Sequence, residues 1–354
     1  MAQQADSLTA QQADSLPRRD TTGRCRVQPL PSIGSAPETG LQYGASVLTV
    51  CDPPASRAAR PSTLVFYALR SAKSQTRVGV EAERWTTGNA RRIAGSFVWK
   101  EFPLPYFGIG DRAPESAREL FTPRGIEASV QLQQRVARAL YVTGVVRHVR
   151  RTITTDTGGA LRRGAVTGTQ KAPITELSLA VEHDTRENLF APRGGHWLQL
   201  SYARSLDGIA SAYDYGRLRA DARVYHAVRG QHVLAAHAQV IGLDGDAPFD
   251  QRALVGGSDI LRGYERGRYR DQWLAAAQGE YRTPIVRRLG GVAFVGGGIV
   301  APSASATGGR VFLPTYGIGL RAQLDARQRT GIRADYGRGK DGASGIYLGF
   351  NQAF

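Results

Sequence analysis

Several residue types are scarce in this sequence. Methionine occurs once and cysteine twice among 354 residues, and only four of the 46 basic residues are lysines. Two cysteines are too few for the disulfide framework of a small secreted domain, and a chain of this length can bury enough core without one. Cys25 and Cys51 could pair in an oxidising compartment or stay unpaired, and the sequence leaves both alternatives open.

Long apolar runs are also absent. No stretch of about 18 consecutive apolar residues occurs, which excludes a transmembrane helix. The mean hydropathy of −0.30 is typical of a soluble protein. Neither observation excludes a membrane protein, because a transmembrane β-barrel alternates apolar and polar residues and therefore has a low mean hydropathy.

Negative charge is scarce relative to positive charge. The chain has 30 acidic residues and a formal net charge of +16, and 42 of its basic residues are arginines. Such an excess is common in nucleic-acid-binding proteins. Here the arginines are spread singly through alternating segments and form no stripe or basic tail. We therefore expect a polar interior, polar loops and contact with anionic lipid headgroups, and no nucleic-acid partner.

Patterns for catalysis or metal binding are missing. The six histidines show no His-x-x-x-His spacing, and the chain has neither a cysteine cluster nor a Gly-x-Ser-x-Gly elbow. The glycines at 296–298 precede no helical pattern and therefore do not form a phosphate-binding loop. We expect no enzymatic activity, no cofactor and no metal site.

Residues 1–40 differ in composition and periodicity from the rest of the chain. The segment QQADSL occurs at 3–8 and again at 11–16, and prolines and arginines follow without apolar periodicity. We interpret 1–40 as a flexible tail and 41–354 as a single folded domain. The tail contains no apolar region typical of a secretory signal peptide.

From residue 41 onward, apolar and polar residues alternate. In the segment 315–324, Tyr316, Ile318 and Leu320 share one face, and Arg321 lies on the other. A period of two predicts β-strands. Segments of about 10–12 residues exceed the ~5–6 residues of an average soluble strand and suit a tilted strand that crosses a bilayer. Short and long connections also alternate along the chain, which is typical of outer-membrane barrels.

The alternating segments number fifteen. They lie near 41–51, 62–72, 76–86, 91–101, 120–135, 140–152, 174–184, 196–206, 213–228, 232–243, 272–283, 290–300, 313–324, 329–338 and 343–354. A closed antiparallel barrel with both ends on one side needs an even number, and the stretch 100–126 is the best place for a missed strand. The sequence predicts an all-β fold, a transmembrane antiparallel β-barrel of 16 strands.

Three segments resemble one family. Residues 255–264 read VGGSDILRGY, and a strand ending in GEYRTP follows at 279–284. Together with the turn at 184–195 and the segments that lead to Phe354, they resemble the C-terminal barrel of the BamA/TamA superfamily, also called the bacterial surface antigen family. The resemblance covers 174–354 and, more loosely, the chain from 41. It implies a multi-pass barrel in the bacterial outer membrane.

The resemblance implies roles for individual residues. Arg262, Gly263 and Tyr264 match the Arg-Gly-aromatic motif of a loop that folds into the lumen, here 244–271. In this family the arginine meets carboxylates on the inner wall, and Glu280 lies on the inward face of its segment. A second acidic residue of the family aligns near Gly296, so Asp335, which also faces inward, is the candidate for that partner. Such an arginine–carboxylate contact can be bidentate and selective.

The C-terminal residue gives a second resemblance. Phe354 shares the outward face of the last segment with Phe350 and Leu348. A terminal aromatic residue on the lipid face resembles the recognition signal of outer-membrane barrels.

The resemblance also implies a function. Its members insert or export outer-membrane proteins or lipids, and many carry periplasmic POTRA domains. About 40 residues precede the first expected strand here, too few for a POTRA domain. We expect a barrel that assists insertion or translocation, acting on unfolded outer-membrane proteins with a separate periplasmic partner. A weakly paired seam between 41–51 and 343–354 would expose a strand edge for this purpose. The alternative is a passive channel or surface antigen with a positively charged lumen.

Overall fold

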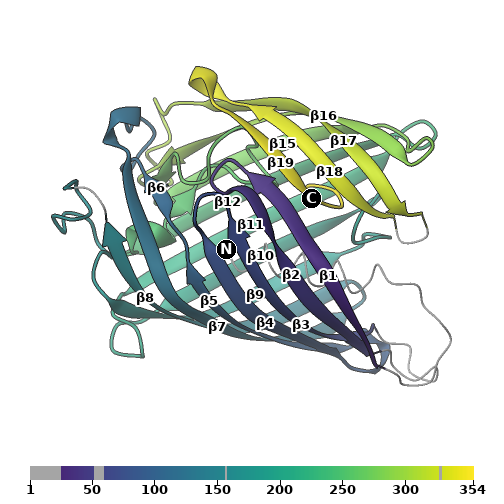
Figure 1. Cartoon of the computed structure of the whole chain (residues 1–354), viewed down its shortest axis with the longest axis horizontal. Coiled ribbons are helices and arrows are strands. Elements are labelled where there is room, and N and C mark those ends of the chain that lie inside the picture. Colours follow the sequence, from purple (N-terminus) through teal and green to yellow (C-terminus); the bar gives the residue numbers. More distant parts are fainter. Residues whose placement is uncertain (1–24, 52–59, 156–157, 327–328) are drawn as a thin grey trace.

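The computed structural model describes residues 25–51, 60–155, 158–326 and 329–354 (Figure 1). Sixteen long strands account for most of these residues. They are β1 (Cys25–Ala36), β2 (Gly40–Cys51), β3 (Ser62–Ser71), β4 (Thr76–Trp85), β5 (Arg91–Glu101), β7 (Glu119–Ala137), β8 (Leu140–Thr155), β9 (Ala172–Asp184), β10 (Gly195–Ser205), β11 (Tyr215–Ala227), β12 (Val233–Gly245), β15 (Trp273–Arg282), β16 (Leu289–Ala301), β17 (Leu313–Asp325), β18 (Thr330–Arg338) and β19 (Ser344–Phe350).

Shorter elements lie in the connections. The three-residue β6 (Leu104–Tyr106) pairs with β7, and β13 (Ala253–Leu254) pairs with β14 (Arg270–Asp271) in a small ribbon of its own. Four single-turn 3-10 helices complete the described elements: η1 (Thr87–Asn89), η2 (Glu115–Ala117), η3 (Phe249–Gln251) and η4 (Lys340–Gly342). None of the helices in the described ranges has the length and apolar character that crossing a membrane requires.

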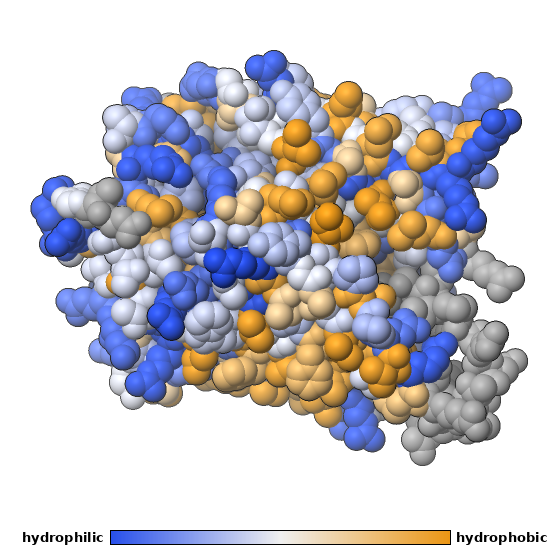
Figure 2. Space-filling model, viewed as in Figure 1, coloured by the Kyte–Doolittle hydropathy of each residue, from blue (hydrophilic) through white to orange (hydrophobic). Residues whose placement is uncertain are grey.

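The long strands close into one antiparallel barrel. Each pairs with its neighbours in chain order, and β1 pairs with both β2 and β19. The predicted 16-stranded all-β antiparallel barrel is therefore confirmed. The outward residues Tyr316, Ile318 and Leu320 on β17 are 52%, 67% and 69% exposed, whereas the inward Arg321 is 4% exposed. Figure 2 shows hydrophobic side chains gathered along the wall, with hydrophilic residues toward its margins.

The first strand of the barrel starts earlier than predicted. Residues 25–36, which we predicted to belong to a flexible tail over 1–40, form β1, so the predicted domain boundary at 41 is wrong. All 12 residues of β1 are in register with β2. The disulfide between Cys25 and Cys51 joins the start of β1 to the end of β2. Residues 1–24 of the predicted tail lie outside the described residues.

Two prolines explain why β1 escaped detection. Pro29 and Pro31 interrupt the apolar pattern, and each lacks the N–H that a central strand would donate. Proline is tolerated in strands at sheet edges, and β1 lies at the least paired position of this barrel. The proline-rich composition that suggested a tail is thus compatible with an edge strand.

The sixteenth strand is therefore β1, and our placement of a missed strand in 100–126 is wrong. That stretch contains the end of β5, the short β6, η2 and the start of β7. Because β7 is 19 residues long, it extends beyond β5, and β6 pairs only with this protruding part. The seam likewise lies between β1 and β19 rather than between 41–51 and the last strand.

The two ends of the barrel differ in the length of their connections. At the end that holds Cys25 and the C-terminal residues, many connections are short, such as 138–139 and 228–232. At the opposite end, 102–118, 156–171 and 246–272 are long. We call these the short-turn end and the long-loop end. In outer-membrane barrels they face the periplasm and the exterior, respectively.

Candidate functional site

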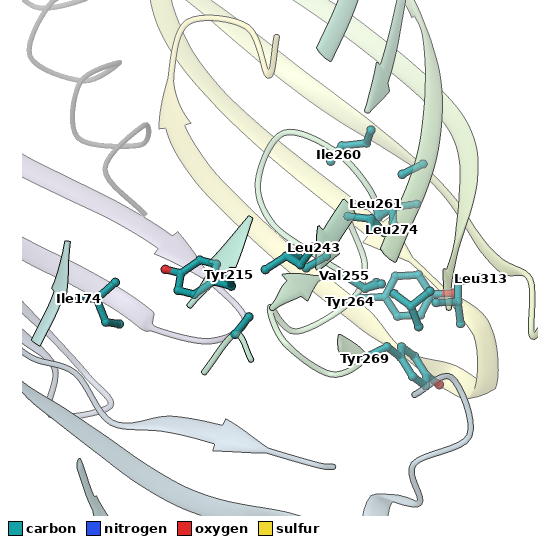
Figure 3. Close-up of a cluster of buried hydrophobic side chains, with 14 of the residues drawn as sticks. Ile174, Tyr215, Leu243, Val255, Ile260, Leu261, Tyr264, Tyr269, Leu274 and Leu313 are labelled. Atoms are coloured by element: carbon teal, nitrogen blue, oxygen red, sulfur yellow. The ribbon is translucent and has the colours of Figure 1, made fainter. Parts of the chain in front are cut away.

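The connection between β12 and β15, residues 246–272, folds into the barrel interior, and we call it the lumen loop. Its Val255, Leu261 and Tyr264 are at most 1% exposed and belong to one buried cluster with Leu274 of β15 and Leu313 of β17. Figure 3 shows these side chains gathered between the loop and the wall. Burial of this apolar surface fixes the loop inside the barrel.

Arg262 of the lumen loop is fully buried against three wall strands. Its Nη1 lies 2.7 Å from Oδ2 of Asp335 on β18, and its Nη2 donates to Glu280 on β15. Its Cζ lies 3.6 Å from the ring centroid of Phe294 on β16. The structure thus brings Arg262 together with both predicted wall carboxylates. An arginine shared between two carboxylates and an aromatic face is held in position and orientation.

Both carboxylates are shared with further arginines. Arg282 pairs with Glu280 at 2.9 Å, and Arg321 and Arg333 pair with Asp335. Glu280 and Asp335 are 2% and 1% exposed. Removing one partner of a buried ion pair costs about 3–5 kcal/mol when the remaining charge is left unpaired. Because these arginines still balance both carboxylates, loss of Arg262 should fall at the low end of that range.

Gly263 allows the loop backbone to lie directly on β18. Its φ is +114°, and a Cβ at this position would lie 2.6 Å from the main-chain carbon of Arg338. A Cβ at Gly337 of β18 would likewise lie 2.8 Å from the main-chain carbon of Arg262. The Gly263 N–H donates to the Tyr347 hydroxyl at 2.8 Å, and that hydroxyl donates to the Tyr264 carbonyl at 3.2 Å. The motif thus contacts β19 as well as β18.

Tyr264 is 1% exposed and joins two further elements. Its hydroxyl donates to the Pro314 carbonyl of β17 at 2.7 Å and accepts from the Lys340 N–H of η4 at 2.8 Å. Burial raises the pKa of Tyr264 to about 12, although the Lys340 N–H opposes the rise. The phenol is therefore a protonated donor at neutral pH.

Contacts of the lumen loop with the first strands, β1–β5, are fewer. Lys73, in the β3–β4 turn, pairs with Glu265 at 3.2 Å, and the side chain of Lys73 is 45% exposed. Burial raises the pKa of Glu38 in the β1–β2 turn, and its own backbone N–H and the nearby Arg266 oppose that rise. By contrast, β6 and β8 hold the loop through buried groups, since Arg270 donates to the Pro105 carbonyl at 3.2 Å and Arg151 pairs with Asp250 at 2.5 Å. The loop is therefore anchored on the C-terminal wall, β15–β19, and on β6–β8, and it makes few contacts with β1–β5, which we call the N-terminal wall.

The seam between β1 and β19 is the least paired junction of the barrel. Among the described residues, Ser35 and Leu348 form the one register pair across it. By contrast, β18 and β19 share seven pairs and β1 and β2 share twelve. Since β19 has seven residues and β1 has twelve, much of β1 has no partner on its seam side.

The chain turns inward after β19, and this corrects the predicted position of Phe354. Asn351 has a φ of +56°, which ends the strand alternation. Phe354 is 5% exposed and lies inside the barrel, where its ring packs 5.0 Å from His237 and its main-chain oxygen accepts from Arg282 at 2.8 Å. Phe354 therefore does not lie on the lipid face. Phe350 is half-buried at the end of β19, and a recognition role for either residue stays a prediction.

Sequence reasoning named Arg262, Glu280 and Asp335 but missed several of their neighbours. Arg321 and Arg333 occupy inward positions of their strands, so the alternation could have identified them. Phe294 lies two residues from Gly296, where the family's second acidic residue aligns, and it offers Arg262 an aromatic face instead. No group of three or more His, Cys, Asp or Glu residues within the described ranges is arranged to hold a metal ion.

A closed barrel with an apolar exterior and an arginine-anchored loop in its lumen defines a class of outer-membrane barrels with an occupied interior. Residues 65–354 match the Omp85 superfamily domain, and the chain belongs to the Omp85 superfamily. This confirms the resemblance to BamA/TamA barrels and the assignment to the outer membrane.

Two solved structures illustrate the similarity in fold. BamA from Haemophilus ducreyi lacking POTRA domains 1-3 has a TM-score of 0.64 and 12% identity, over 93% of this chain and 70% of that chain. CdiB from Escherichia coli also has a TM-score of 0.64 and 12% identity, over 93% of this chain and 67% of that chain. At this identity the likeness shows the fold alone. No curated protein has a significant sequence match to the chain.

Proposed function

We propose that this barrel assists the insertion or translocation of outer-membrane proteins or lipids at the β1–β19 seam. The observation that carries the proposal is the single register pair between Ser35 and Leu348, among the described residues, where other adjacent long strands share seven or more. A strand edge with unpaired backbone groups is a template for another strand. An unfolded outer-membrane protein can therefore add a strand there by β-augmentation.

The lumen loop determines which side of the seam moves. Its hydrogen bonds with Tyr347 hold β19, whereas its links to the N-terminal wall are Glu38 with Arg266 and the exposed pair of Lys73 and Glu265. Net hydrogen bonds contribute about 0.5–1.5 kcal/mol each, and breaking the buried Arg262 pairs costs about 3 kcal/mol. The seam therefore opens before the loop leaves the wall, and β1 moves away from β19.

The same geometry argues against the alternative of a passive channel. A channel needs a free path through the lumen, but the lumen loop packs its apolar residues against the inner wall. The positive charge of the interior is largely engaged, since Arg262, Arg282 and Arg321 all pair with carboxylates. The proposed role needs no catalytic residue, and it is compatible with a separate periplasmic partner that delivers the cargo.

A disulfide across the seam tests the proposal. Leu348 faces Ser35 across the seam and Ala334 of β18 on its other side. Directly opposed residues of antiparallel strands have Cα atoms about 4.5–5.5 Å apart, within the range that disulfides span. Ser35→Cys with Leu348→Cys locks the seam, whereas Ala334→Cys with Leu348→Cys locks an ordinary strand pair of the same barrel.

The readout is the folding of an added outer-membrane barrel into liposomes that contain the purified protein, scored by heat-modifiable migration on a gel. We expect the seam lock to abolish the assistance and the β18–β19 lock to retain it. Equal activity of the two locked barrels would contradict the proposal. Reduction should restore the seam-locked barrel, and the parent protein under the same reducing conditions controls for the native disulfide.

A further inference from the structure

A hollow lies at the short-turn end of the barrel, between the C-terminal wall and the β9–β10 turn, residues 185–194. It holds about 660 Å³ of empty space, part of it open to solvent. Four arginines line it: Arg193, Arg282, Arg321 and Arg329. No aspartate or glutamate is among its described lining residues. The lining is therefore rich in arginine, although Glu280, Asp335 and Glu187 behind it balance part of the charge.

Two of these arginines are buried and carry guanidinium nitrogens without an acceptor. Arg282 and Arg321 are 5% and 4% exposed. Nη1 of Arg282 and Nη2 of Arg321 have no hydrogen-bond partner within the part of the chain that the structure describes. A buried charged donor without an acceptor is costly. Each residue thus has one guanidinium nitrogen, closed to solvent, for which the described residues supply no acceptor.

The remaining nitrogens of these two arginines are occupied, which fixes the guanidinium groups. Arg282 donates to Glu280 and to the main-chain oxygen of Phe354. Arg321 donates through Nε to the side-chain oxygen of Gln352 at 2.8 Å and through Nη1 to Asp335. The free nitrogens are therefore preorganised, because the rest of each guanidinium group is already held.

The other two arginines lie at the margin of the hollow. Arg329 pairs with Glu187 of the β9–β10 turn at 2.8 Å, and Arg193 of the same turn donates to Gln231 at 3.2 Å. These two side chains are more accessible than Arg282 and Arg321, and they can reorient toward a ligand. The hollow thus has two buried, fixed arginines, Arg282 and Arg321, and two marginal arginines, Arg193 and Arg329, that can change rotamer.

We propose that this hollow is a binding site for a phosphate-type oxyanion. Four guanidinium groups from different elements surround one space, which suits a tetrahedral anion with several acceptor oxygens better than a planar carboxylate with two. The shared chemistry allows two sources, the phosphate of a lipid headgroup and a free phosphate from the periplasmic side. No residue of β1 is among its described lining residues, and Arg282 and Arg321 also pair with the two carboxylate partners of Arg262. Anion binding in this hollow goes beyond the proposed function.

A carboxylate introduced at Gln352 tests the site. Gln352→Glu places a negative charge on the oxygen that accepts from Arg321, so it competes with a bound anion without removing an arginine. Gln131→Glu is a matched control, because Gln131 also accepts a hydrogen bond from a lumen arginine, Arg92, but lies outside this hollow. Heat-modifiable migration shows that each full-length variant is folded.

The probe is inorganic phosphate, titrated into the purified protein in zwitterionic detergent against chloride at matched ionic strength. We expect saturable binding of one phosphate per chain by calorimetry and a rise in Tm that chloride does not produce. Gln352→Glu should weaken phosphate binding at least tenfold and raise Tm in phosphate-free buffer, and Gln131→Glu should bind like the parent protein. Equal effects of phosphate and chloride, or unchanged binding by Gln352→Glu, would overturn the proposal.

A second arm distinguishes the sources. Phosphatidylglycerol is offered in nanodiscs without free phosphate, and lipid retained per barrel is counted by native mass spectrometry. If the parent protein retains one lipid more than the Gln352→Glu variant, the site binds a lipid headgroup. Equal lipid retention, together with selective phosphate binding, assigns it to a free anion. Failure of both arms rejects the site and leaves the seam proposal unaffected.

Discussion

The C-terminal and N-terminal walls of this barrel are built from the same kind of strand but are held differently. The C-terminal wall binds the lumen loop through Arg262, which is fully buried and shared between Glu280 and Asp335. The N-terminal wall, β1–β5, contacts that loop less, through the exposed pair of Lys73 with Glu265 and through Glu38 with Arg266. Where the walls meet, one register pair joins β1 to β19 among the described residues. We expect the C-terminal wall to stay in place and β1, the edge strand of the N-terminal wall, to move.

The largest expected effect comes from removing the anchor of the fixed wall. Arg262→Ala removes two buried ion pairs, while Arg282 stays with Glu280 and further arginines stay with Asp335, so it should cost about 3 kcal/mol. The loop should detach, so conductance in a planar bilayer should increase and heat-modifiable migration should be lost at a lower temperature.

A matched control lies on the N-terminal wall. Arg92 of β5 pairs with Glu83 at 2.6 Å, and both side chains are 15% exposed. Because this pair is closer to solvent, Arg92→Ala should cost less than Arg262→Ala, about 1–2 kcal/mol. Equal losses from the two substitutions would remove the contrast between the walls.

A second prediction separates close packing from backbone strain. Gly263→Ala places a Cβ 2.6 Å from the β18 main chain at a φ of +114°, whereas Gly110, at a φ of +103°, has no atom within 4 Å of an added Cβ. Gly110→Ala should cost about 1 kcal/mol for the unfavourable φ. Gly263→Ala should cost about 1–3 kcal/mol more, because the loop must also move away from β18. Thermal unfolding of both variants measures the difference, and equal shifts in Tm would contradict the contact.

A third and smaller effect should follow from loosening β19 alone. Tyr347→Phe removes the hydroxyl that accepts from the Gly263 N–H and donates to the Tyr264 carbonyl. The loss of these two hydrogen bonds should lower the free energy of unfolding by about 1–2 kcal/mol. Oxidation of a Ser35→Cys, Leu348→Cys pair should become slower in this background, because β19 samples more positions relative to β1. Tyr336→Phe on the outward face of β18 is the control. An unchanged oxidation rate would mean that the loop does not position β19.

The smallest effect concerns the β9–β10 turn at the short-turn end. Partial burial raises the pKa of Glu187, but the backbone N–H of Arg193 and the side chain of Arg329 lower it more, so its pKa lies below the usual value. A depressed carboxyl pKa stabilises the folded state above the unfolded pKa, and this stability is lost as pH falls through the folded pKa. Glu187→Gln should therefore lower Tm slightly at pH 7 and leave it unchanged at low pH. A pH-independent difference would contradict the pairing.

Much of the fold was predictable because a barrel strand has a simple sequence rule. Outward residues such as Ile318 and inward residues such as Arg321 alternate, and the alternation predicted the wall and most strand positions. The alternation failed at β1, where Pro29 and Pro31 interrupt the pattern. A strand tolerates these prolines only because β19, its neighbour across the seam, pairs with it at a single position. The pairing of β1 with β19 depends on closure of the whole barrel and cannot be recognised in the local sequence.

The candidate site was predictable in part for a similar reason. The family resemblance implied the role of Arg262 and its carboxylate partners, and strand parity placed Glu280 and Asp335 on the inward face. The orientation of Phe354 could not be predicted from parity. Asn351 has a positive φ, which ends the strand and turns the residues after it inward. Likewise, the hollow with four arginines gathers side chains from distant connections and strands, which only the folded barrel brings together.

Hydrogen exchange of the folded barrel tests the central contrast most directly. We expect β1 and β19 peptides to exchange at least tenfold faster than β16 and β17 peptides, because their seam-side backbone groups open to solvent while the loop holds the C-terminal wall. Protection of β1 and β19 equal to that of β16 and β17 would show a seam as firmly closed as any other strand pair, and would contradict the account.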